Sequence, residues 1–256
     1  MCCIMIMVRL TIKDFLKEAV PMHSSLEQDR LYVTVDLLIM TVREGKLILY
    51  LSRREDAPYA GRWALPGRFV DLEESAEVTA GRLLEEMLPV PGSFIEQLYT
   101  FTEVSRDPRG RVISAAYLVI VPEGKLSGAP MREKTKMKPF EARLEEDGLR
   151  LTGEDGTVLR TSDLAFDHGR IIETGIIRLQ GKIDYTDIGF RFLNDPDAFP
   201  LGELQTVFEA VLGTPMDPSN FRRSILGRYE KTGRLTQTEQ TEKKSRGRPA
   251  ALYRFR

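Results

Sequence analysis

A short amphipathic helix followed by two prolines is the feature that most constrains how this chain can fold. Helical periodicity begins near Ser75, and the apolar residues fall at positions i, i+4, i+7 and i+11: Ala76, Ala80, Leu83 and Met87. Pro89 and Pro91 end the helix, because proline lacks a backbone N–H and clashes with the preceding turn. The single apolar face of this helix requires a packing surface from the rest of the domain.

The segments on either side of the helix have the patterns of β-strands. "LYVTVDLLIMTV" (31–42) is β-branched and mostly apolar, which predicts a strand buried on both faces, and "LILYLSRRE" (47–55) returns after the turn "REGK". "FIEQLYTFTEV" (94–104) and "RVISAAYLVIVP" (111–122) form a second pair. Residues 123–163 are charged and contain Asp-Gly turns, which predicts a β insertion. We therefore expect an α+β fold.

A second helix and a domain boundary follow. "LAFDHGRIIETGIIRLQGKI" (164–183) predicts a helix with Asp167 as its N-cap and with three inward-facing residues, Ile172, Ile176 and Leu179. "FLNDPDAFP" (192–200) contains two prolines and two aspartates, and we place the boundary there. The predicted parts are an N-terminal extension (1–30), a first domain (31–192) and a second domain (193–256).

The C-terminal part has the order helix, turn, helix, hairpin. "LGELQTVFEAVLG" (201–213) ends at Gly213 and carries one apolar stripe, formed by Leu201, Leu204, Phe208, Val211 and Leu212. A second helix is predicted at 218–231, capped by Asp217 and with an inward stripe of Phe221, Ile225 and Tyr229. Two alternating runs then flank the basic turn "KKSRGRPA". This order is typical of a winged helix-turn-helix.

Charge is unevenly distributed along the chain. The net charge is −1, but residues 213–256 hold 11 Lys and Arg against 4 Asp and Glu, so this part carries +7 and the rest −8. A basic tail on an acidic body suggests a polyanion partner, although charge alone fits a solvated, flexible C-terminus equally well. Cys2 and Cys3 form no disulfide framework, and the short apolar start lacks a basic leader, so we expect a cytoplasmic protein without a membrane span.

Two adjacent glutamates on the proline-bounded helix raise the question of a metal site. Mg²⁺ is usually held by one or two carboxylates together with water and substrate phosphates, and a helix brings positions i, i+3 and i+4 together. Those positions are Arg82, Glu85 and Glu86 here, with Gly67 and Glu73 in the segment before the helix. Paired glutamates usually form a solvated helix face, so Glu85 and Glu86 are weak candidates for metal ligands.

This spacing resembles the Nudix hydrolase signature, which runs Gly, five residues, Glu, seven residues, Arg-Glu, an aliphatic residue, any residue, Glu-Glu. The matching residues are Gly67, Glu73, Leu83, Glu85 and Glu86. Gly81 replaces the signature Arg, Arg82 replaces a metal-binding Glu, and Leu88 replaces the closing Gly. In the family, the signature Arg anchors the loop glutamate, which Gly81 cannot do. Moving the register by one residue makes Arg82 the signature Arg but misplaces the Glu-Glu pair.

The resemblance implies a catalytically degenerate Nudix domain. We expect Mg²⁺-dependent pyrophosphate hydrolysis to be lost or severely reduced, because Arg82 places a cation where the family binds the metal. No cofactor is then required, and no catalytic residue is expected beyond the remnants Gly67, Glu73, Glu85 and Glu86. The alternative is an active pyrophosphohydrolase of a nucleoside diphosphate derivative, with Mg²⁺ held by the three glutamates.

A Nudix-like domain followed by a winged helix resembles the Nudix-related transcription regulators, bacterial proteins that control NAD synthesis genes and include sugar-responsive relatives. The stretches that carry the resemblance are "VTVD", "RRED…YAGRWALPG", "LAFDHGRII", "PLGELQTVFEAVLG", "NFRR" and "GRPAALYRF". The resemblance implies an α/β/α sandwich with a mixed sheet, a homodimer formed mainly through the Nudix domains, and a double-stranded DNA operator. It also implies a repressor with a small-molecule effector, such as ADP-ribose or a sugar, in the old substrate pocket.

Particular residues are expected to bind the effector and the DNA. Arg53 and Arg54 are candidates for phosphate binding and Trp63 for stacking on a base, with surface charge and loop packing as the alternative roles. The candidate DNA-binding residues are Ser219, Asn220, Arg222, Arg223 and Lys231 on the second helix, and Arg246 and Arg248 at the wing tip. A scaffold whose winged helix binds protein is the remaining alternative.

Overall fold

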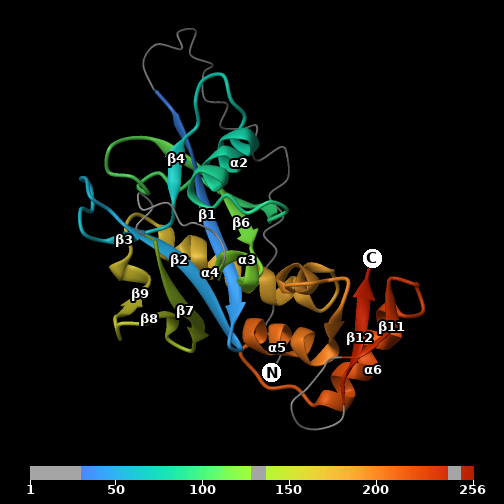
Figure 1. Cartoon of the computed structure of the whole chain (residues 1–256). Helices are drawn as coiled ribbons and strands as arrows, with labels where there is room; N and C mark the ends of the chain where they lie inside the picture. Colours follow the sequence, from blue (N-terminus) through green and yellow to red (C-terminus); the bar gives the residue numbers. More distant parts are fainter. Residues whose placement is uncertain (1–29, 128–136, 242–248) are drawn as a thin grey trace, which may run out of the picture. The chain divides into compact units, whose positions relative to one another are not determined.

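The computed structural model describes residues 30–127, 137–241 and 249–256, and residues 32–256 form one compact unit (Figure 1). Its main sheet contains β1 (Tyr32–Arg43), β2 (Lys46–Arg53), β3 (Trp63–Ala64), β4 (Gly67–Phe69), β5 (Phe94–Phe101), β6 (Val112–Ile120), β7 (Met137–Glu145), β8 (Gly148–Gly153) and β9 (Val158–Arg160). The strand order is β5-β6-β1-β2-β7-β8-β9, with β3 paired to β2 and β4 to β1. Because β1 and β6 run parallel and the other pairs antiparallel, the sheet is mixed, as expected.

Strand β1 lies at the centre of two apolar cores. Val35, Leu37 and Ile39 belong to one core with the buried face of α2 (Ala76–Met87). Leu38 and Met40 belong to the other core with α4 (His168–Ile183), because successive residues of a strand point to opposite faces. The predicted burial of this strand on both faces is confirmed. The helix predicted from Ser75 is also confirmed, with the Ser75 side chain accepting a hydrogen bond from the Val78 N–H at 3.3 Å.

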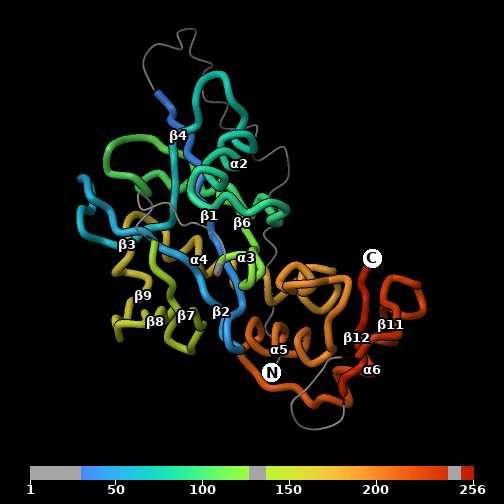
Figure 2. The backbone as a smooth tube through the Cα atoms, viewed as in Figure 1, coloured from blue at the N-terminus to red at the C-terminus, as the bar shows by residue number. Residues whose placement is uncertain are grey.

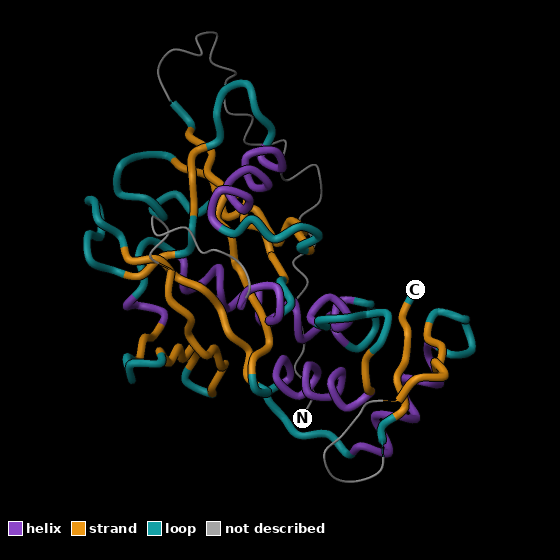
Figure 3. Tube along the Cα trace, in the orientation of Figure 1, coloured by secondary structure: helices purple, strands orange, loops and turns teal. Residues whose placement is uncertain are grey.

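The C-terminal part has the predicted order of elements (Figure 3). It contains the 3-10 helix η3 (Ile188–Phe192), β10 (Phe199–Pro200), α5 (Leu201–Leu212), α6 (Pro218–Tyr229), β11 (Leu235–Thr241) and β12 (Ala251–Phe255). Helix α5 ends at Gly213, whose φ of 72° suits a residue without a side chain. Helix α6 begins where Asp217 accepts a hydrogen bond from the Asn220 N–H at 2.8 Å. It ends two residues earlier than predicted, so Lys231 lies beyond it.

One apolar core extends from the sheet into the C-terminal part. Ile176 and Leu179 of α4, Leu204 and Phe208 of α5, and Ile225 of α6 all belong to the core that contains Leu38. The backbone trace in Figure 2 follows the chain from α4 through η3 into α5. The Phe190 ring of η3 stacks on Phe255 of β12, with ring centroids 3.7 Å apart.

Three details differ from the sequence predictions. The predicted insertion forms β-hairpins, with the turn Glu146-Asp147 between β7 and β8 and a turn at 154–156 between β8 and β9, but β7 also pairs with β2 and so extends the main sheet. Its start contains a short helix, α3 (Glu123–Ser127), that the sequence pattern did not indicate. Asp167 occupies the N-cap position of α4 without capping it, because its carboxylate pairs with Arg106 instead.

Among the segments that the structure describes, no helix has both the length and the apolar character needed to cross a bilayer.

Candidate effector pocket and nucleic-acid interface

Gly67 holds β4 tightly against β1. It pairs with Asp36, and a Cβ added at Gly67 would lie 2.2 Å from the Asp36 Oδ1 atom and 3.0 Å from the Val35 carbonyl oxygen. Such distances exclude any side chain unless the strands move apart. The glycine that opens the Nudix-like spacing is therefore required by this close strand pairing, and the next residue, Arg68, contacts Glu86 of α2.

Arg82 anchors the loop that precedes α2. Its Nε and Nη2 atoms donate to the two carboxylate oxygens of Glu74 at 3.1 and 2.7 Å, and Nη2 also donates to Asp71 at 2.9 Å. The expectation that the loop has lost its anchor is therefore wrong. Glu74 precedes Arg82 by the interval that separates loop glutamate and arginine in the signature. Glu74 and Arg82 therefore form the Glu–Arg pair of the register shifted by one residue. Glu73, the loop glutamate of the unshifted register, lies exposed.

Glu86 is enclosed by two guanidinium groups. Arg68 donates to both of its carboxylate oxygens at 3.1 and 2.6 Å, and Arg82 reaches it at 3.3 Å from the preceding turn of α2. The hydrogen bonds from Arg68 hold the pKa of Glu86 below its usual value, and those from Arg82 do the same for the pKa of Glu74. Arg82 and Glu86 form an i, i+4 ion pair along α2.

These residues do not fit a Mg²⁺ site. The carboxylates of Glu74 and Glu86 face arginines, which repel a cation, and Glu85 lies exposed on a different side of α2. Within residues 30–127, 137–241 and 249–256, no three His, Cys, Asp or Glu side chains come together as a metal site requires. Of the two glutamates proposed as weak metal candidates, Glu86 is thus paired with arginines and Glu85 is exposed to solvent.

A pocket of about 130 Å³ lies beside β1 and β4. Four arginines line it: Arg54, Arg68, Arg106 and Arg109. Two aromatic rings complete its walls, because the Arg54 guanidinium lies 4.8 Å from the Phe166 centroid, and Arg109 lies 5.4 Å from Phe166 and 5.3 Å from Phe69. We call this the arginine-lined pocket. Its cations and ring faces suit a ligand with phosphates and a flat ring.

A buried network of charged groups forms the floor of the arginine-lined pocket. Arg106, with 3% of its side chain exposed, donates to the Asp167 carboxylate oxygens at 3.0 and 2.7 Å. Its Nη2 atom also lies 3.5 Å from Asp36, which accepts a hydrogen bond from the Ser114 hydroxyl at 2.5 Å. Arg106 thus contacts both carboxylates, and the Ser114 hydroxyl adds a hydrogen bond to Asp36, which lowers the cost of burying these charges.

His168 belongs to the same floor. Its Nδ1 atom accepts a hydrogen bond from the Leu65 N–H at 2.8 Å, and its Nε2 atom lies 3.6 Å from Asp36. Burial lowers the pKa of the imidazole, with the carboxylates of Asp36 and Asp167 acting in the opposite direction. The ring is therefore neutral at pH 7, with its proton on Nε2. The sequence assigned no role to this histidine and did not identify Arg106 or Arg109.

The three residues predicted to bind the effector are neighbours at the end of β2 and on β3, where Arg53 pairs with Trp63, but their side chains have different surroundings. Arg54 lines the arginine-lined pocket. Arg53 is exposed and donates from Nε to the Gly61 carbonyl oxygen at 2.8 Å, on the neighbouring turn. Trp63 packs edge-to-face on Phe140, with ring centroids 5.0 Å apart, and contacts the core on the α4 side. Its contacts are those of the loop-packing alternative.

The predicted DNA-binding residues of α6 lie together on its exposed side. Phe221, Ile225 and Tyr229 are buried, as predicted, while Ser219, Asn220 and Arg223 are exposed near the start of the helix. The other predicted residues differ in their positions. Arg222 is exposed and donates to the Tyr253 hydroxyl of β12 at 2.7 Å, Lys231 is exposed in the turn after α6, and Arg246 and Arg248 lie outside the described residues.

The basic side chains at the start of α6 have few competing partners. Arg223 donates to the Asn220 side-chain oxygen at 2.5 Å, and this pair leaves most of the guanidinium donors directed at solvent. A helix N-terminus with exposed polar and arginine side chains suits the major groove of DNA and its flanking phosphates.

Comparisons with known proteins agree with this geometry. Residues 31–146 match the family model described as NUDIX domain, and residues 189–255 match the model described as NrtR DNA-binding winged helix domain. The ADPR responsive transcriptional repressor NtrR of Acinetobacter baylyi is 31% identical over 227 residues, which cover 87% of this chain and 81% of that protein.

Two solved structures extend the comparison to the fold. NrtR of Shewanella oneidensis, complexed with a 27mer DNA, has a TM-score of 0.68 at 31% identity, covering 88% of this chain and 93% of that one. A MutT/nudix family protein from Enterococcus faecalis has a TM-score of 0.72 at 26% identity, covering 96% and 94%. The chain therefore belongs to the NrtR family of Nudix-related transcription regulators, in which a Nudix domain precedes a DNA-binding winged helix.

Proposed function

We propose that this protein is a transcriptional repressor whose winged helix binds an operator and whose Nudix domain releases the DNA when it binds ADP-ribose. The observation that carries the proposal is the arginine-lined pocket in a chain that aligns with most of the ADPR responsive repressor of Acinetobacter baylyi. In this proposal the protein acts in the cytoplasm, where its operator and its effector are both present.

The chemistry of the pocket supports ADP-ribose over a simple sugar. Arginine side chains dominate the charged lining of the pocket, and guanidinium groups form charge-assisted hydrogen bonds with a pyrophosphate, which a neutral sugar lacks. The rings of Phe69 and Phe166 each face the Arg109 guanidinium. A ring that binds a cation in this way can also stack on the flat base of a nucleotide. Arg54 contributes to the pocket, whereas Arg53 and Trp63 support it from outside.

The exposed start of α6 supports binding to duplex DNA. Ser219, Asn220 and Arg223 are short or forked donors at a helix N-terminus, the arrangement that reads base edges and contacts phosphates. The Shewanella oneidensis relative was solved with a 27mer DNA. A homodimer that presents two winged helices to a palindromic operator is part of the proposal.

Hydrolysis is not part of the proposed function. Arg68 and Arg82 both pair with Glu86, one of the three glutamates that would hold Mg²⁺ in the active alternative, so we propose that pyrophosphate hydrolysis has been given up in favour of recognition. The same salt bridges argue against the active pyrophosphohydrolase. The arginines at the start of α6 argue against a purely protein-binding scaffold.

A fluorescence anisotropy titration tests the proposal. DNA from upstream of the protein's own gene is titrated at two salt concentrations, with ADP-ribose, with ribose or with no addition. We expect salt-sensitive binding that ADP-ribose weakens and ribose does not. Binding that is insensitive to both salt and ADP-ribose would overturn the proposal. Incubation of the protein with Mg²⁺ or Mn²⁺ and ADP-ribose should give no AMP, and turnover near ~1 s⁻¹ would restore the hydrolase.

A further inference from the structure

We propose that α4 transmits occupancy of the arginine-lined pocket to the winged helix, and that Asp167 and Gln180 are the coupling residues at its two ends. This inference rests on the proposed function and adds the path between its two sites. The path consists of one rigid helix with specific contacts at each end and a cleft beside the far end.

The first turn of α4 is bound to the floor of the arginine-lined pocket. Arg106, which lines that pocket, pairs with Asp167 through both of its carboxylate oxygens. His168, the first residue of α4, receives the Leu65 N–H from the other side of the pocket. A ligand phosphate that attracts the Arg106 guanidinium therefore disturbs its ion pair with Asp167. This disturbance acts directly on the first turn of α4.

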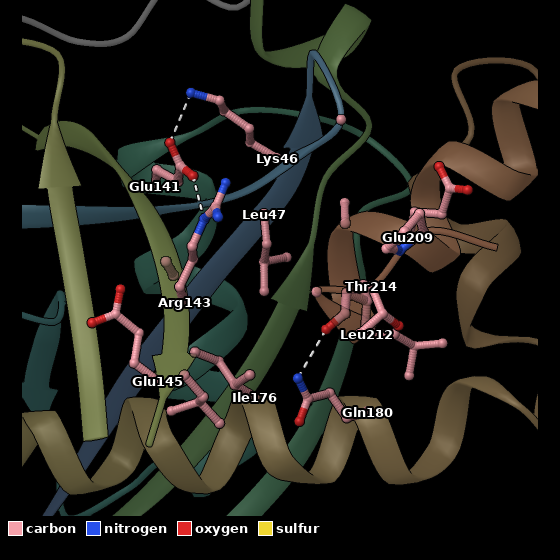
Figure 4. Close-up of a pocket in the computed structure, with 17 residues that line it drawn as sticks. Lys46, Leu47, Glu141, Arg143, Glu145, Ile176, Gln180, Glu209, Leu212 and Thr214 are labelled. Atoms are coloured by element: carbon pink, nitrogen blue, oxygen red, sulfur yellow. Dashed lines mark hydrogen bonds and ion pairs between the residues drawn. The ribbon is translucent and has the colours of Figure 1, made fainter. Parts of the chain in front are cut away.

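The last turns of α4 are bound to the winged helix. Gln180 donates from Nε2 to the Val211 carbonyl oxygen at 3.0 Å, near the C-terminus of α5 (Figure 4). Just after α4, the Thr186 carbonyl oxygen accepts a hydrogen bond from the Tyr229 hydroxyl of α6 at 3.0 Å. Asp187 also forms an ion pair with Arg234, in the turn before β11. Both helices of the winged part thus have a polar contact with the α4 segment.

A cleft of about 500 Å³ lies beside the contact between α4 and α5. Figure 4 shows its walls, with Glu141 and Arg143 of β7 on one side, Gln180 of α4 below, and Leu212 and Thr214 at the end of α5 opposite. The cleft is open to solvent, since Lys46, Arg143 and Thr214 in its lining are exposed. The C-terminus of α5 is therefore held by α4 on one side and has room to move toward β7 on the other.

These contacts give a two-state mechanism a physical basis. A helix transmits a shift of its first turn along its whole length because its backbone hydrogen bonds fix the turns relative to one another. The ligand changes DNA affinity only to the extent that it binds the two α4 positions differently. Asp167 and Gln180 are positioning residues in this scheme, since neither lines the arginine-lined pocket nor lies on the exposed side of α6.

The first test removes each coupling interaction separately in the full-length protein. Asp167→Asn weakens the ion pair with Arg106, and Gln180→Leu removes the hydrogen bond to α5. In the wild type, we expect ADP-ribose to weaken DNA binding by roughly 5–150-fold, the usual range of allosteric coupling. In either variant, measured at saturating ADP-ribose, this ratio should fall toward one while DNA binding without ADP-ribose remains close to wild type. Gln180→Leu, which lies far from the arginine-lined pocket, should also keep the wild-type calorimetric affinity for ADP-ribose.

Thr174→Ala is the matched control. Thr174 lies on the same helix, and its hydroxyl bonds only to the Arg170 carbonyl oxygen within α4. This variant should keep the full response to ADP-ribose. If both coupling variants respond as Thr174→Ala does, α4 is not the path. If the wild type binds ADP-ribose and DNA independently, the proposed function itself fails and the inference with it.

The second test fills the cleft and leaves the hydrogen bonds of α4 in place. Ala210 lines the cleft and is half-buried, so Ala210→Phe places a ring in the space between α5 and β7. We expect this variant to bind ADP-ribose normally and to show little of the wild-type change in DNA affinity. A full response in a folded Ala210→Phe protein would show that α5 does not use the cleft, and would overturn that step of the inference.

Discussion

Two glycines of the Nudix-like segment have opposite surroundings, and this gives a prediction at the scale of single residues. Gly67→Ala would push a methyl group to within 2.2 Å of the Asp36 carboxylate, so we expect it to lower the free energy of unfolding by about 1–3 kcal/mol. Gly81 lies within α2, and an added Cβ there meets no atom within 4 Å. Gly81→Ala should therefore raise stability by roughly 0.5–1 kcal/mol. Urea denaturation of both variants measures the two effects, and equal effects would contradict the argument.

Adjacent arginines give a second residue-scale prediction. Arg54 lines the arginine-lined pocket and Arg53 does not, although both carry the same charge at neighbouring positions. Arg54→Gln should weaken ADP-ribose binding by about 10–100-fold, because a hydrogen bond to a charged group contributes roughly 1.5–3 kcal/mol. Arg53→Gln should leave the affinity nearly unchanged. Isothermal titration calorimetry distinguishes them, and a larger loss in the Arg53 variant would place the ligand elsewhere.

Residues that act through long-range contacts could not be predicted from the sequence. Arg106 and Asp167 are 61 positions apart, and only the fold of β5, β6 and α4 brings them together. Gly67, Glu85 and Glu86 fit one register of the signature, whereas the pair Glu74 and Arg82 fits the register shifted by one, so spacing alone could not decide which glutamate of the loop is anchored. The sequence did identify Gly67, because the signature fixes the spacing between this glycine and the glutamates that follow it. His168 was missed because a histidine in the first turn of a helix has no distinctive pattern.

At the scale of elements, the loop and helix α2 form a unit whose stability depends on pH. The salt bridges with Arg82 and Arg68 lower the pKa values of Glu74 and Glu86 in the folded protein from 4.5. A lowered carboxyl pKa contributes stability above the unfolded value, and this stability is lost as pH falls through the folded value. Arg82→Gln should therefore lower the Tm at pH 7, and the difference from wild type should shrink below about pH 4.5.

Thermal unfolding between pH 3 and pH 7 tests this prediction for the loop and α2. Glu85→Gln is the control, because Glu85 is an exposed carboxylate of the same helix, and its Tm should follow the wild type. If the Tm difference between Arg82→Gln and wild type stays constant with pH, Arg82 contributes to stability through packing of its apolar stem rather than through its charge.

The elements with strong periodicity were predictable, and the exceptions have physical causes. The hairpin of β1 and β2, helix α2 and helices α5 and α6 each have a clear apolar period together with a cap or turn residue. Helix α3 has five residues, too few for a period to be visible. The pairing of β7 with β2 is a long-range contact that no local pattern encodes. Asp167 is the N-cap residue of α4 as predicted, but its carboxylate does not cap the helix because the buried Arg106 guanidinium pairs with it.

At the scale of the whole molecule, the uneven charge predicts how DNA binding depends on salt. Arg222 and Arg223 lie at the start of α6, in the part of the chain that carries +7. Replacing both with Gln should weaken DNA binding strongly and reduce the salt slope by about 1 for each of the two arginines that binds a phosphate. Arg170→Gln, an exposed arginine of α4, is the control and should keep the wild-type slope. An unchanged slope in the double variant would move the DNA interface away from α6.

The apolar core that runs from the sheet through α4 into α5 and α6 also limits how the protein could be re-engineered or recombined. Leu204 and Phe208 of α5 pack in the same core as Ile176 and Leu179 of α4. A winged helix transplanted from another regulator would meet an α4 surface shaped for these side chains, and it would leave a void or a clash there. A chimera made to exchange DNA specificity between relatives should therefore succeed only when α4 is transferred together with the winged helix. A chimera joined within residues 192–200 would instead expose the apolar side of α4 and aggregate.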